Sequence, residues 1–252
     1  MFQYQAPADL LNGKVILVTG TGSGIGRTTA LTYASHGATV ILLGRNIEKL
    51  EAVYDEIEVN QWPQPAIYPM NLEGAGDNDY IQLAETLEKE FGQLDGLLHN
   101  ASQLGELKPI SQFPTQSWVD ILQVNLNAPF IMTRELLPLL RQSGAASIIF
   151  TSSGVGHKGR AHWGAYSVSK FATEGLMQIL ADEEDGVSSV RVNTINPGGT
   201  RTSMRASAFP GEDPQSLPTP EDIMPVYLYL MGSESLNVSG QAFHAQKGND
   251  EQ

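Results

Sequence analysis

The sequence predicts an α/β fold in which one doubly wound parallel sheet carries helices on both faces. Short apolar runs alternate with longer segments whose apolar residues recur at helical spacing, and this alternation is typical of βαβ units with right-handed crossovers. The sequence contains no break in composition typical of a linker, no internal repeat and no low-complexity tract. Single α/β domains often reach about 250 residues. The 252 residues therefore predict one domain spanning 1–252.

Strands are expected where Val, Ile and Leu follow one another, because strands covered on both faces are continuously apolar. They lie at residues 15–18, 40–43, 66–70, 96–99, 147–151 and 190–195, and a short last strand is expected at 241–244. Helical periodicity predicts helices at residues 24–36, 47–59, 77–91, 115–140, 163–183 and 220–231. Pro129 and Pro138 fall inside the fourth helix and predict a kink or a late start there.

One long stretch fits neither pattern. Residues 196–219 contain four prolines and predict an irregular segment. Loops of this length inside a compact domain are usually lids or binding loops, so we interpret the stretch as a substrate loop or lid. The alternative is an irregular excursion on the surface.

Composition and charge exclude several classes of function. The chain has 28 acidic and 15 basic side chains and a net charge of −13, which argues against nucleic acid as a partner. It has no cysteine, which excludes disulfides, thiolate metal sites and cysteine nucleophiles. Its five histidines lack the spacing of metal ligands, so no metal is expected. The absence of a signal peptide and of any membrane-spanning apolar run predicts a cytoplasmic protein with no membrane partner.

A glycine-rich turn follows the first predicted strand and opens the first helix. Residues 19–26 are Thr-Gly-Thr-Gly-Ser-Gly-Ile-Gly, with Gly20, Gly24 and Gly26 in GxxxGxG spacing. Such a turn lets the backbone approach a pyrophosphate and points helix N–H groups at it, as in Rossmann-type folds. A P-loop would need a glycine and a lysine where this chain has Thr21 and Arg27. Dinucleotide binding is therefore preferred.

The end of the second strand indicates which dinucleotide binds. NAD is normally held by an acidic residue that follows the glycines by about 20 residues and bonds the ribose 2′-hydroxyl. Here the chain has no acid and instead presents Arg45, whose guanidinium suits a 2′-phosphate. We therefore expect NADP(H) in preference to NAD(H). The alternative is that Arg45 is a solvated side chain beside a helix.

Three side chains with complementary chemistry are expected to meet near this turn. Tyr166 and Lys170 stand four residues apart on a predicted helix and share one face. A phenol is a poor base at neutral pH, and a neighbouring ammonium lowers its pKa by stabilising the phenolate. Ser153 lies at the carboxyl end of the fifth strand, where ligands of open α/β sheets bind, and can donate to a substrate oxygen.

These motifs resemble those of the short-chain dehydrogenase/reductase family over nearly the whole chain. The family's Thr-Gly-x-x-x-Gly-x-Gly is similar to residues 19–26, its Asn-Ala-Gly to residues 100–102, and its Pro-Gly-x-x-x-Thr to residues 197–202. Its catalytic tetrad resembles Asn125, Ser153, Tyr166 and Lys170. Residues 196–202 and 204–210 are most similar to the bacterial YciK-type oxidoreductases of this family.

The resemblance implies an NADP(H)-dependent oxidoreductase that interconverts a carbonyl and a primary or secondary alcohol of a small-molecule substrate by hydride transfer. Tyr166 would exchange the proton, Lys170 would lower the tyrosine pKa and bind ribose hydroxyls, Ser153 would orient the substrate oxygen, and Asn125 would hold a relay water. A homodimer or homotetramer through the helices at 115–140 and 163–183 is also implied. The implied cofactor contacts are Gly20, Thr21, Ser23, Gly24, Ile25, Gly26, Arg45, Asn71, Leu72, Asn100, Ala101, Tyr166, Lys170, Pro197, Gly198, Thr200 and Thr202.

Two positions depart from the family pattern. Ser102 replaces the usual glycine of the Asn-Ala-Gly segment. Asn71 stands where an acidic residue commonly holds adenine, which puts the affinity for adenine in question although an amide can still donate or accept.

The substrate is left open between two interpretations. Basic residues gather on the two loops expected to flank Tyr166, and a local positive field would recruit an anionic substrate. They are His157, Lys158, Arg160, His162, Arg201 and Arg205. Alternatively, these residues face solvent or another subunit, and Trp163 walls an apolar pocket. The expected substrate contacts are Ser153, Trp163, Arg201 and Arg205.

Two other functions were weighed against catalysis by hydride transfer. A catalytically silent NADP(H)-binding sensor or regulatory module uses the same fold, but such sensors usually lose the tyrosine or the lysine, and both are present here. Residues 167–170 match the Ser-x-x-Lys of penicillin-interactive enzymes. Those enzymes also need Ser-Asp-Asn and Lys-Thr-Gly, which this sequence lacks.

Overall fold

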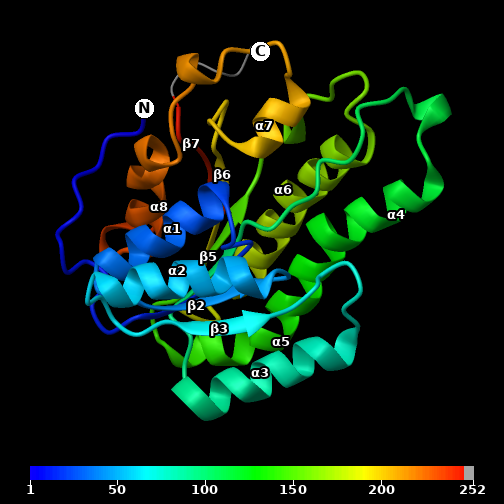
Figure 1. Cartoon of the computed structure of the whole chain (residues 1–252). Coiled ribbons are helices and arrows are strands. Elements are labelled where there is room, and N and C mark those ends of the chain that lie inside the picture. The colour runs from blue at the N-terminus through cyan, green and yellow to red at the C-terminus, as the bar shows by residue number, and fades with distance from the viewer. Residues whose placement is uncertain (247–252) are drawn as a thin grey trace.

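The computed structural model describes residues 1–246, and the last six residues of the expected domain, 247–252, lie outside the described part. Within the described part of the chain, seven parallel strands form one sheet in the order β3-β2-β1-β4-β5-β6-β7, with helices on both faces (Figure 1). Strand order reverses between β1 and β4, as in doubly wound sheets. The predicted single-domain Rossmann-type fold is therefore confirmed.

The strands form where the apolar runs predicted them, within one residue at each end. They are β1 (Val15–Thr19), β2 (Thr39–Gly44), β3 (Ala66–Pro69), β4 (Gly96–His99), β5 (Ser147–Thr151), β6 (Arg191–Asn196) and β7 (Ala242–His244). Successive side chains on a strand point to opposite faces. In β1, Leu17 therefore enters one core, and Ile16 and Val18 enter the other.

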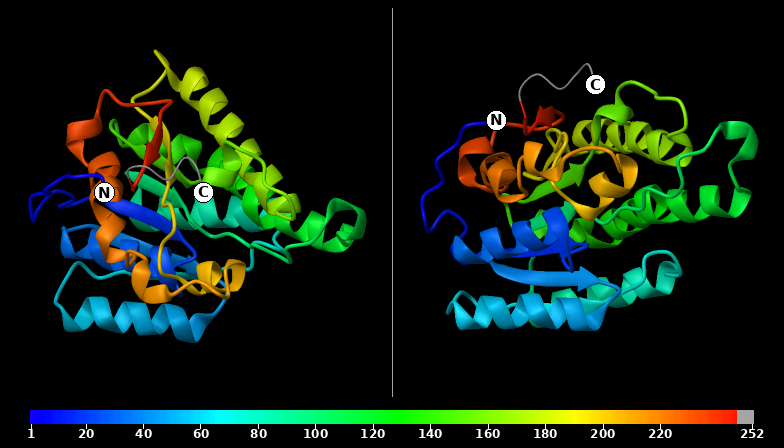
Figure 2. Two further views of the ribbon diagram at one scale, coloured as in Figure 1. Left: turned by 90° about the horizontal axis from the view of Figure 1, so that it is seen from above. Right: turned by 45° about the horizontal axis from the view of Figure 1, so that its top comes forward.

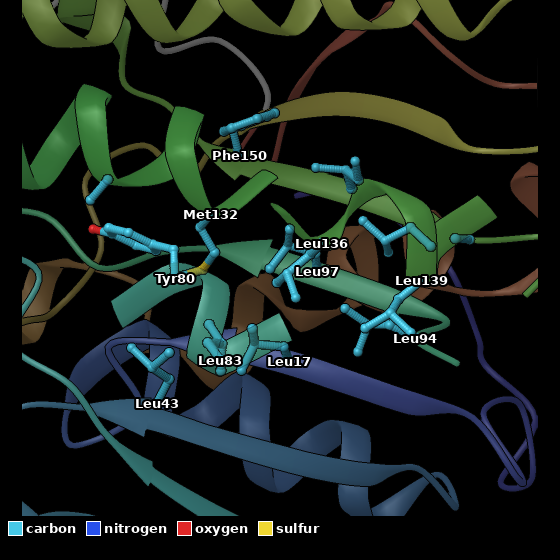
Figure 3. Close-up of a cluster of buried hydrophobic side chains, with 14 of the residues drawn as sticks. Leu17, Leu43, Tyr80, Leu83, Leu94, Leu97, Met132, Leu136, Leu139 and Phe150 are labelled. Atoms are coloured by element: carbon cyan, nitrogen blue, oxygen red, sulfur yellow. The ribbon is translucent and has the colours of Figure 1, made fainter. Parts of the chain in front are cut away.

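The two cores lie on opposite faces of the sheet, and Figures 1 and 2 show the helices that cover these faces. One is covered by α1 (Gly24–Ser35), α2 (Ile47–Val59) and α8 (Met224–Met231), which a 3₁₀ turn precedes at Glu221–Ile223. The other is covered by α3 (Asp77–Phe91), α5 (Ala128–Gln142) and α6 (Gly164–Glu184). In Figure 3, Tyr80 and Leu83 of α3 and Met132, Leu136 and Leu139 of α5 belong to one buried cluster that covers the strands.

No helix among residues 1–246 is long and apolar enough to span a bilayer.

The helix expected at 115–140 is divided into α4 (Thr115–Leu122) and α5 by a π-helical turn, Gln123–Asn127. Pro129 gives the physical reason, because it has no amide hydrogen to donate to the carbonyl of Asn125 four residues earlier. An extra residue in the turn accommodates the lost bond. The helix continues through Pro138, so only the first proline interrupts it.

The stretch at 196–219 is only partly irregular, which corrects the expectation. It contains α7 (Ser203–Ala208) and a 3₁₀ turn, Pro214–Ser216. Thr202 begins α7 because its side-chain oxygen accepts a hydrogen bond from the amide of Arg205 (3.2 Å). The helix lies beside the first part of α6 (Figure 1), where Trp163 contacts Phe209.

Candidate active site

A cleft of about 450 Å³ opens where the parallel strands end. Its walls come from the segments that follow β1 to β6, together with α7 and the start of α6. This volume lies in the range of small-molecule sites. The sheet therefore gathers residues far apart in sequence around one cavity.

The glycine turn between β1 and α1 forms one wall. Gly20 has φ +75° and its amide donates to the carbonyl of Leu43 (2.8 Å). A Cβ atom at Gly26 would lie 2.3 Å from the carbonyl oxygen of Gly20 and 2.5 Å from Nδ2 of Asn100. Only glycine fits there, so the helix start packs directly on the turn and Gly20, Ser23, Gly24 and Ile25 line the cleft.

Thr19, at the end of β1, fixes the segment after β4. Its buried Oγ1 accepts hydrogen bonds from the amides of Asn100 (2.9 Å) and Ala101 (3.0 Å) and donates to the carbonyl of Leu98 (3.3 Å). The amide of the Asn100 side chain donates to the Thr19 carbonyl (3.2 Å). These bonds bring Asn100 and Ala101 to the cleft.

Two cations stand beside the glycine turn, and the sequence reasoning identified only Arg45. Arg45 follows β2, is exposed and lines the cleft. Lys49 lines it too, and its Cβ lies 3.1 Å from where a Cβ on Gly22 would be. Asn46 caps α2 by accepting a hydrogen bond from the amide of Lys49 (2.9 Å). The missed signal was a lysine in the first turn of a capped helix, four residues after Arg45.

Ser153, Tyr166 and Lys170 meet on the opposite wall. The Ser153 hydroxyl is hydrogen-bonded to Tyr166. The Lys170 ammonium donates to the carbonyl of Thr151 (2.7 Å) and lies 5.5 Å from the centre of the Tyr166 ring. A Cβ on Gly156 would be 3.0 Å from the Lys170 backbone, so the turn after Ser153 packs closely on α6.

Burial shifts the pKa values of Tyr166 and Lys170 in opposite directions. Burial raises the pKa of Tyr166 to about 12, while the hydrogen bond from Ser153 acts in the opposite direction. Burial lowers the pKa of Lys170 to about 8, and the Glu174 carboxylate opposes that fall. At pH 7 the phenol is therefore protonated and most of the lysine is charged.

A buried carboxylate, Glu174, lies one helical turn beyond Lys170. Its Oε2 accepts a hydrogen bond from the hydroxyl of Thr194 on β6 (2.9 Å), and its Oε1 lies 3.3 Å from Nε2 of His157. The His157 ring lies 6.0 Å from that of His244 on β7. The sequence reasoning did not identify Glu174, although its spacing of four from Lys170 placed it on the same helix face.

Asn125 is buried behind the cleft. Its Oδ1 accepts a hydrogen bond from the amide of Gln103 (2.7 Å), and its Nδ2 donates to the Gln103 carbonyl (2.9 Å) and to Oγ of Ser169 (3.0 Å). Both amide hydrogens are thus used to hold the segment after β4 against α6.

Most predicted contacts line the cleft. They are Gly20, Ser23, Gly24, Ile25, Arg45, Asn71, Leu72, Asn100, Ala101, Ser153, Trp163, Tyr166, Lys170, Pro197, Gly198, Thr200, Thr202 and Arg205. Four do not line it: Thr21, Gly26, Asn125 and Arg201. Thr21 is buried with its hydroxyl 3.5 Å from the Leu43 carbonyl. Arg201 instead donates to the carbonyls of Gln215 (3.3 Å) and Leu217 (3.0 Å).

The donor groups of the cleft fit a dinucleotide. The buried hydroxyls of Ser102 and Ser152 line it and have no hydrogen-bond partner within residues 1–246. The glycine turn has no room for a side chain at Gly26, so a phosphate could approach its backbone amides closely. Arg45 and Lys49, which line the cleft beside this turn, would add positive charge for phosphates. In the same described range, no group of three or more His, Asp or Glu side chains could hold a metal ion.

Comparison with known proteins gives the family. Residues 14–213 match the family model described as short chain dehydrogenase. The chain is 55% identical to the oxidoreductase YciK of Escherichia coli K12, covering 97% of this chain and 96% of that protein. It matches a short chain dehydrogenase structure from Pseudomonas syringae with TM-score 0.94 and 57% identity, over 98% of this chain and 100% of that one. A structure from Escherichia coli CFT073 complexed with NADPH gives TM-score 0.93 and 55% identity, over 96% and 100%.

The resemblance to YciK-type oxidoreductases is thus confirmed on both sequence and structure. The family model covers most of the chain, and its matched residues include the glycine turn, Tyr166 and Lys170. The chain belongs to the short-chain dehydrogenase/reductase family.

Proposed function

We propose that this chain is an NADP(H)-dependent oxidoreductase that interconverts a carbonyl and a primary or secondary alcohol of a small molecule by hydride transfer. The observation that carries the proposal is the convergence of Ser153, Tyr166 and Lys170 on the same cleft as the glycine turn. The NADPH complex of the Escherichia coli relative supports the choice of cofactor.

The cleft suggests how the cofactor would be held. The turn at Gly20–Ile25 would receive the pyrophosphate, and Arg45 with Lys49 the 2′-phosphate. Adenine would lie beside Asn71 and Leu72. The nicotinamide half would lie between Asn100, Ala101 and Lys170 on one side and Pro197, Gly198, Thr200 and Thr202 on the other. When bound, the nicotinamide supplies or accepts the hydride.

Tyr166 handles the proton. In reduction its phenol donates a proton to the carbonyl oxygen as that oxygen gains negative charge, and in oxidation the phenolate removes the hydroxyl proton. Ser153 orients the same oxygen, and the Lys170 ammonium stabilises the phenolate. At neutral pH the phenol is protonated, which is the form that donates a proton in reduction.

The role proposed for Asn125 shifts from its side chain to its backbone. The side chain holds the segment at Gln103 and does not line the cleft. Pro129 cannot give the Asn125 carbonyl the hydrogen bond that a regular helix would supply. This carbonyl is the group we propose for a relay water.

We also propose that residues 196–219, including α7, form a substrate lid.

We further propose that the protein is a cytoplasmic homodimer or homotetramer. Exposed apolar side chains on α4, α5 and α6 support self-association at these helices. They are Val119 (51% exposed), Phe130 (47%), Val168 (44%), Phe171 (44%) and Ile179 (58%). Sedimentation velocity of the wild type and of Phe171→Asp measures the assembly, and a monomeric wild type would contradict it.

Substitution of Tyr166 by Phe tests the proposed chemistry. Consumption of NADPH and NADH is followed in parallel over aldehydes, ketones and quinones. We expect tighter binding of NADPH than of NADH, and a variant that keeps the wild-type Kd for NADPH but loses about 10²–10⁴-fold in kcat. A variant with wild-type kcat would refute the role of Tyr166. Binding of NADPH with no turnover of any compound would favour the sensor.

A further inference from the structure

The part of the cleft in front of Ser153 and Tyr166 is walled by apolar side chains. They come from the segment after β4, from the start of α6 and from α7, and they are Leu104, Trp163, Met204, Ala208 and Phe209. If the proposed function holds, this compartment receives the substrate, because the hydroxyls that would contact the reacting oxygen face it.

An aromatic surface leads away from the phenol. The Trp163 ring lies 5.8 Å from the Tyr166 ring, at an interplanar angle of 54°. The same indole lies 5.8 Å from Phe209, at 43°. Trp163 therefore joins the catalytic tyrosine to α7 in one row of rings. Such rings offer a large rigid apolar surface for a flat group and add edge-to-face or stacking contacts.

Arg201 and Arg205, the two cations expected to contact the substrate, are engaged within the protein. Nε and Nη2 of Arg205 each lie 2.6 Å from a carboxylate oxygen of Glu212. The same guanidinium lies 3.8 Å from the centre of the Phe209 ring. Arg201 donates to the carbonyls of residues 215 and 217 and does not line the cleft. Arg160 lies 5.4 Å from the Phe209 ring and is exposed outside the cleft.

An anionic group entering this compartment would meet a guanidinium that already has a carboxylate partner. It would also meet an apolar wall in which an unpaired charge is costly. We propose that the site takes an uncharged carbonyl compound, or the corresponding alcohol, whose reacting carbon carries a flat apolar group that packs on Trp163 and Phe209. In the reducing direction the carbonyl gains a hydride from NADPH and a proton from Tyr166, giving the alcohol and NADP⁺.

Three ketones separate charge from shape. Ethyl benzoylformate is neutral and aromatic, benzoylformate carries the same ketone beside a carboxylate, and ethyl pyruvate lacks the ring. We expect kcat/KM for ethyl benzoylformate to exceed that for ethyl pyruvate by about 10-fold, through the ring contact. It should exceed that for benzoylformate by about 100-fold, because Arg205 is already paired with Glu212 and Arg201 does not line the cleft.

Two variants test the residues. Phe209→Ala should remove the preference for the ring, with an unchanged Kd for NADPH. Glu212→Gln should raise the ratio of kcat/KM for benzoylformate to kcat/KM for the neutral ester about 10-fold, because it frees Arg205 while any loosening of the segment affects both substrates alike. Glu88→Gln, on α3 away from the cleft, is the matched control. The proposal would be overturned if the wild type gave equal kcat/KM for ethyl benzoylformate and benzoylformate. It would also be overturned if neither Phe209→Ala nor Glu212→Gln changed the ratios of kcat/KM among the three ketones.

Failure of this proposal and failure of the proposed function give different results. If no ketone is reduced, the dissociation constants of the same three compounds are measured by calorimetry with saturating NADP⁺. Tighter binding of ethyl benzoylformate than of the other two supports the substrate class while hydride transfer fails. Binding that favours the carboxylate, or no binding of any of the three, overturns the substrate class.

Discussion

Replacing Glu174 by Gln should lower the pKa of Lys170. The amide preserves the size of the side chain and an oxygen for the Thr194 hydroxyl, but it removes the negative charge next to the lysine. Groups one helical turn apart lie about 6 Å from each other. At an effective dielectric constant of about 20 the lost attraction is about 3 kcal/mol, equivalent to about 2 in pKa.

The groups facing Glu174 reduce this magnitude. His157 lies 3.3 Å from the carboxylate and carries positive charge when protonated, and His244 of β7 lies beside His157. Removing the carboxylate also removes its attraction for these rings. We therefore expect the pKa of Lys170, about 8 in the wild type, to fall by about 1 to 2. At pH 7 half or more of the lysine would then be neutral, and its stabilisation of the Tyr166 phenolate would weaken.

The side-chain resonances of lysine report this directly. The chain has seven lysines, and Lys170→Arg assigns the one of interest in protein labelled with ¹³C-lysine. A titration from pH 5 to 10 gives its pKa in the wild type, in Glu174→Gln and in the control Glu183→Gln, which changes an exposed carboxylate of the same helix. An unchanged pKa in Glu174→Gln would refute the proposed coupling.

The free energy of unfolding should change with pH as Lys170 loses its proton. A lysine whose pKa is lower in the folded state than in the unfolded state binds fewer protons when folded, so the free energy of unfolding rises with pH between the two values. Wild-type stability should therefore gain from Lys170 as pH rises from about 8 towards 10.4. In Glu174→Gln this gain should begin at lower pH, as measured by urea unfolding.

The remaining predictions concern three separate contacts. Arg45→Ala combined with Lys49→Ala should raise the Kd for NADPH about 100-fold and leave that for NADH nearly unchanged, and an equal loss for both cofactors would contradict a 2′-phosphate site. Gly26→Ala would place a Cβ 2.3 Å from a backbone oxygen of the turn, so calorimetry should detect no NADPH binding at 1 mM. Hydrogen bonds from Arg141 hold the pKa of the buried Glu184 low. Because this stabilisation exists above the unfolded pKa and is lost as pH falls through the folded one, Glu184→Gln should lower stability by about 2 kcal/mol at pH 7 but much less at pH 3. An equal loss at both pH values would rule out the ion pair as the cause.

The strands could be predicted because side chains on both of their faces are buried, which gives an unbroken apolar run in the sequence. Residues on β1, β4 and β5 alternate between two cores, and both faces need Val, Ile or Leu. The same reasoning failed at α7, because a helix of six residues has too little periodicity and begins through a single cap at Thr202. Pro129 predicted an interruption, but not that it would be a π-helical turn carrying Asn125.

The backbone part of the site was easier to predict than the side chains around it. The glycine turn and the Tyr166–Lys170 spacing are local patterns, and both reach the cleft. Phe209 and Glu174 have no such pattern. Phe209 reaches the cleft through the path of residues 196–219, and Glu174 is recognisable as part of the site only from its contacts with Thr194 on β6 and with His157.

The basic residues near residues 196–219, the proposed lid, show why charge in a sequence does not identify a ligand. Arg160, Arg201 and Arg205 all contact the segment at 209–217, through the Phe209 ring, two carbonyls and Glu212. These three side chains therefore contact residues 209–217 of the proposed lid and help to hold that segment in place. Salt would weaken the Arg205–Glu212 pair for any substrate, whereas attraction of an anion is screened only when the substrate is charged. Equal salt inhibition of kcat/KM for ethyl benzoylformate and benzoylformate would indicate loosening of the lid, and inhibition confined to benzoylformate would indicate electrostatic steering.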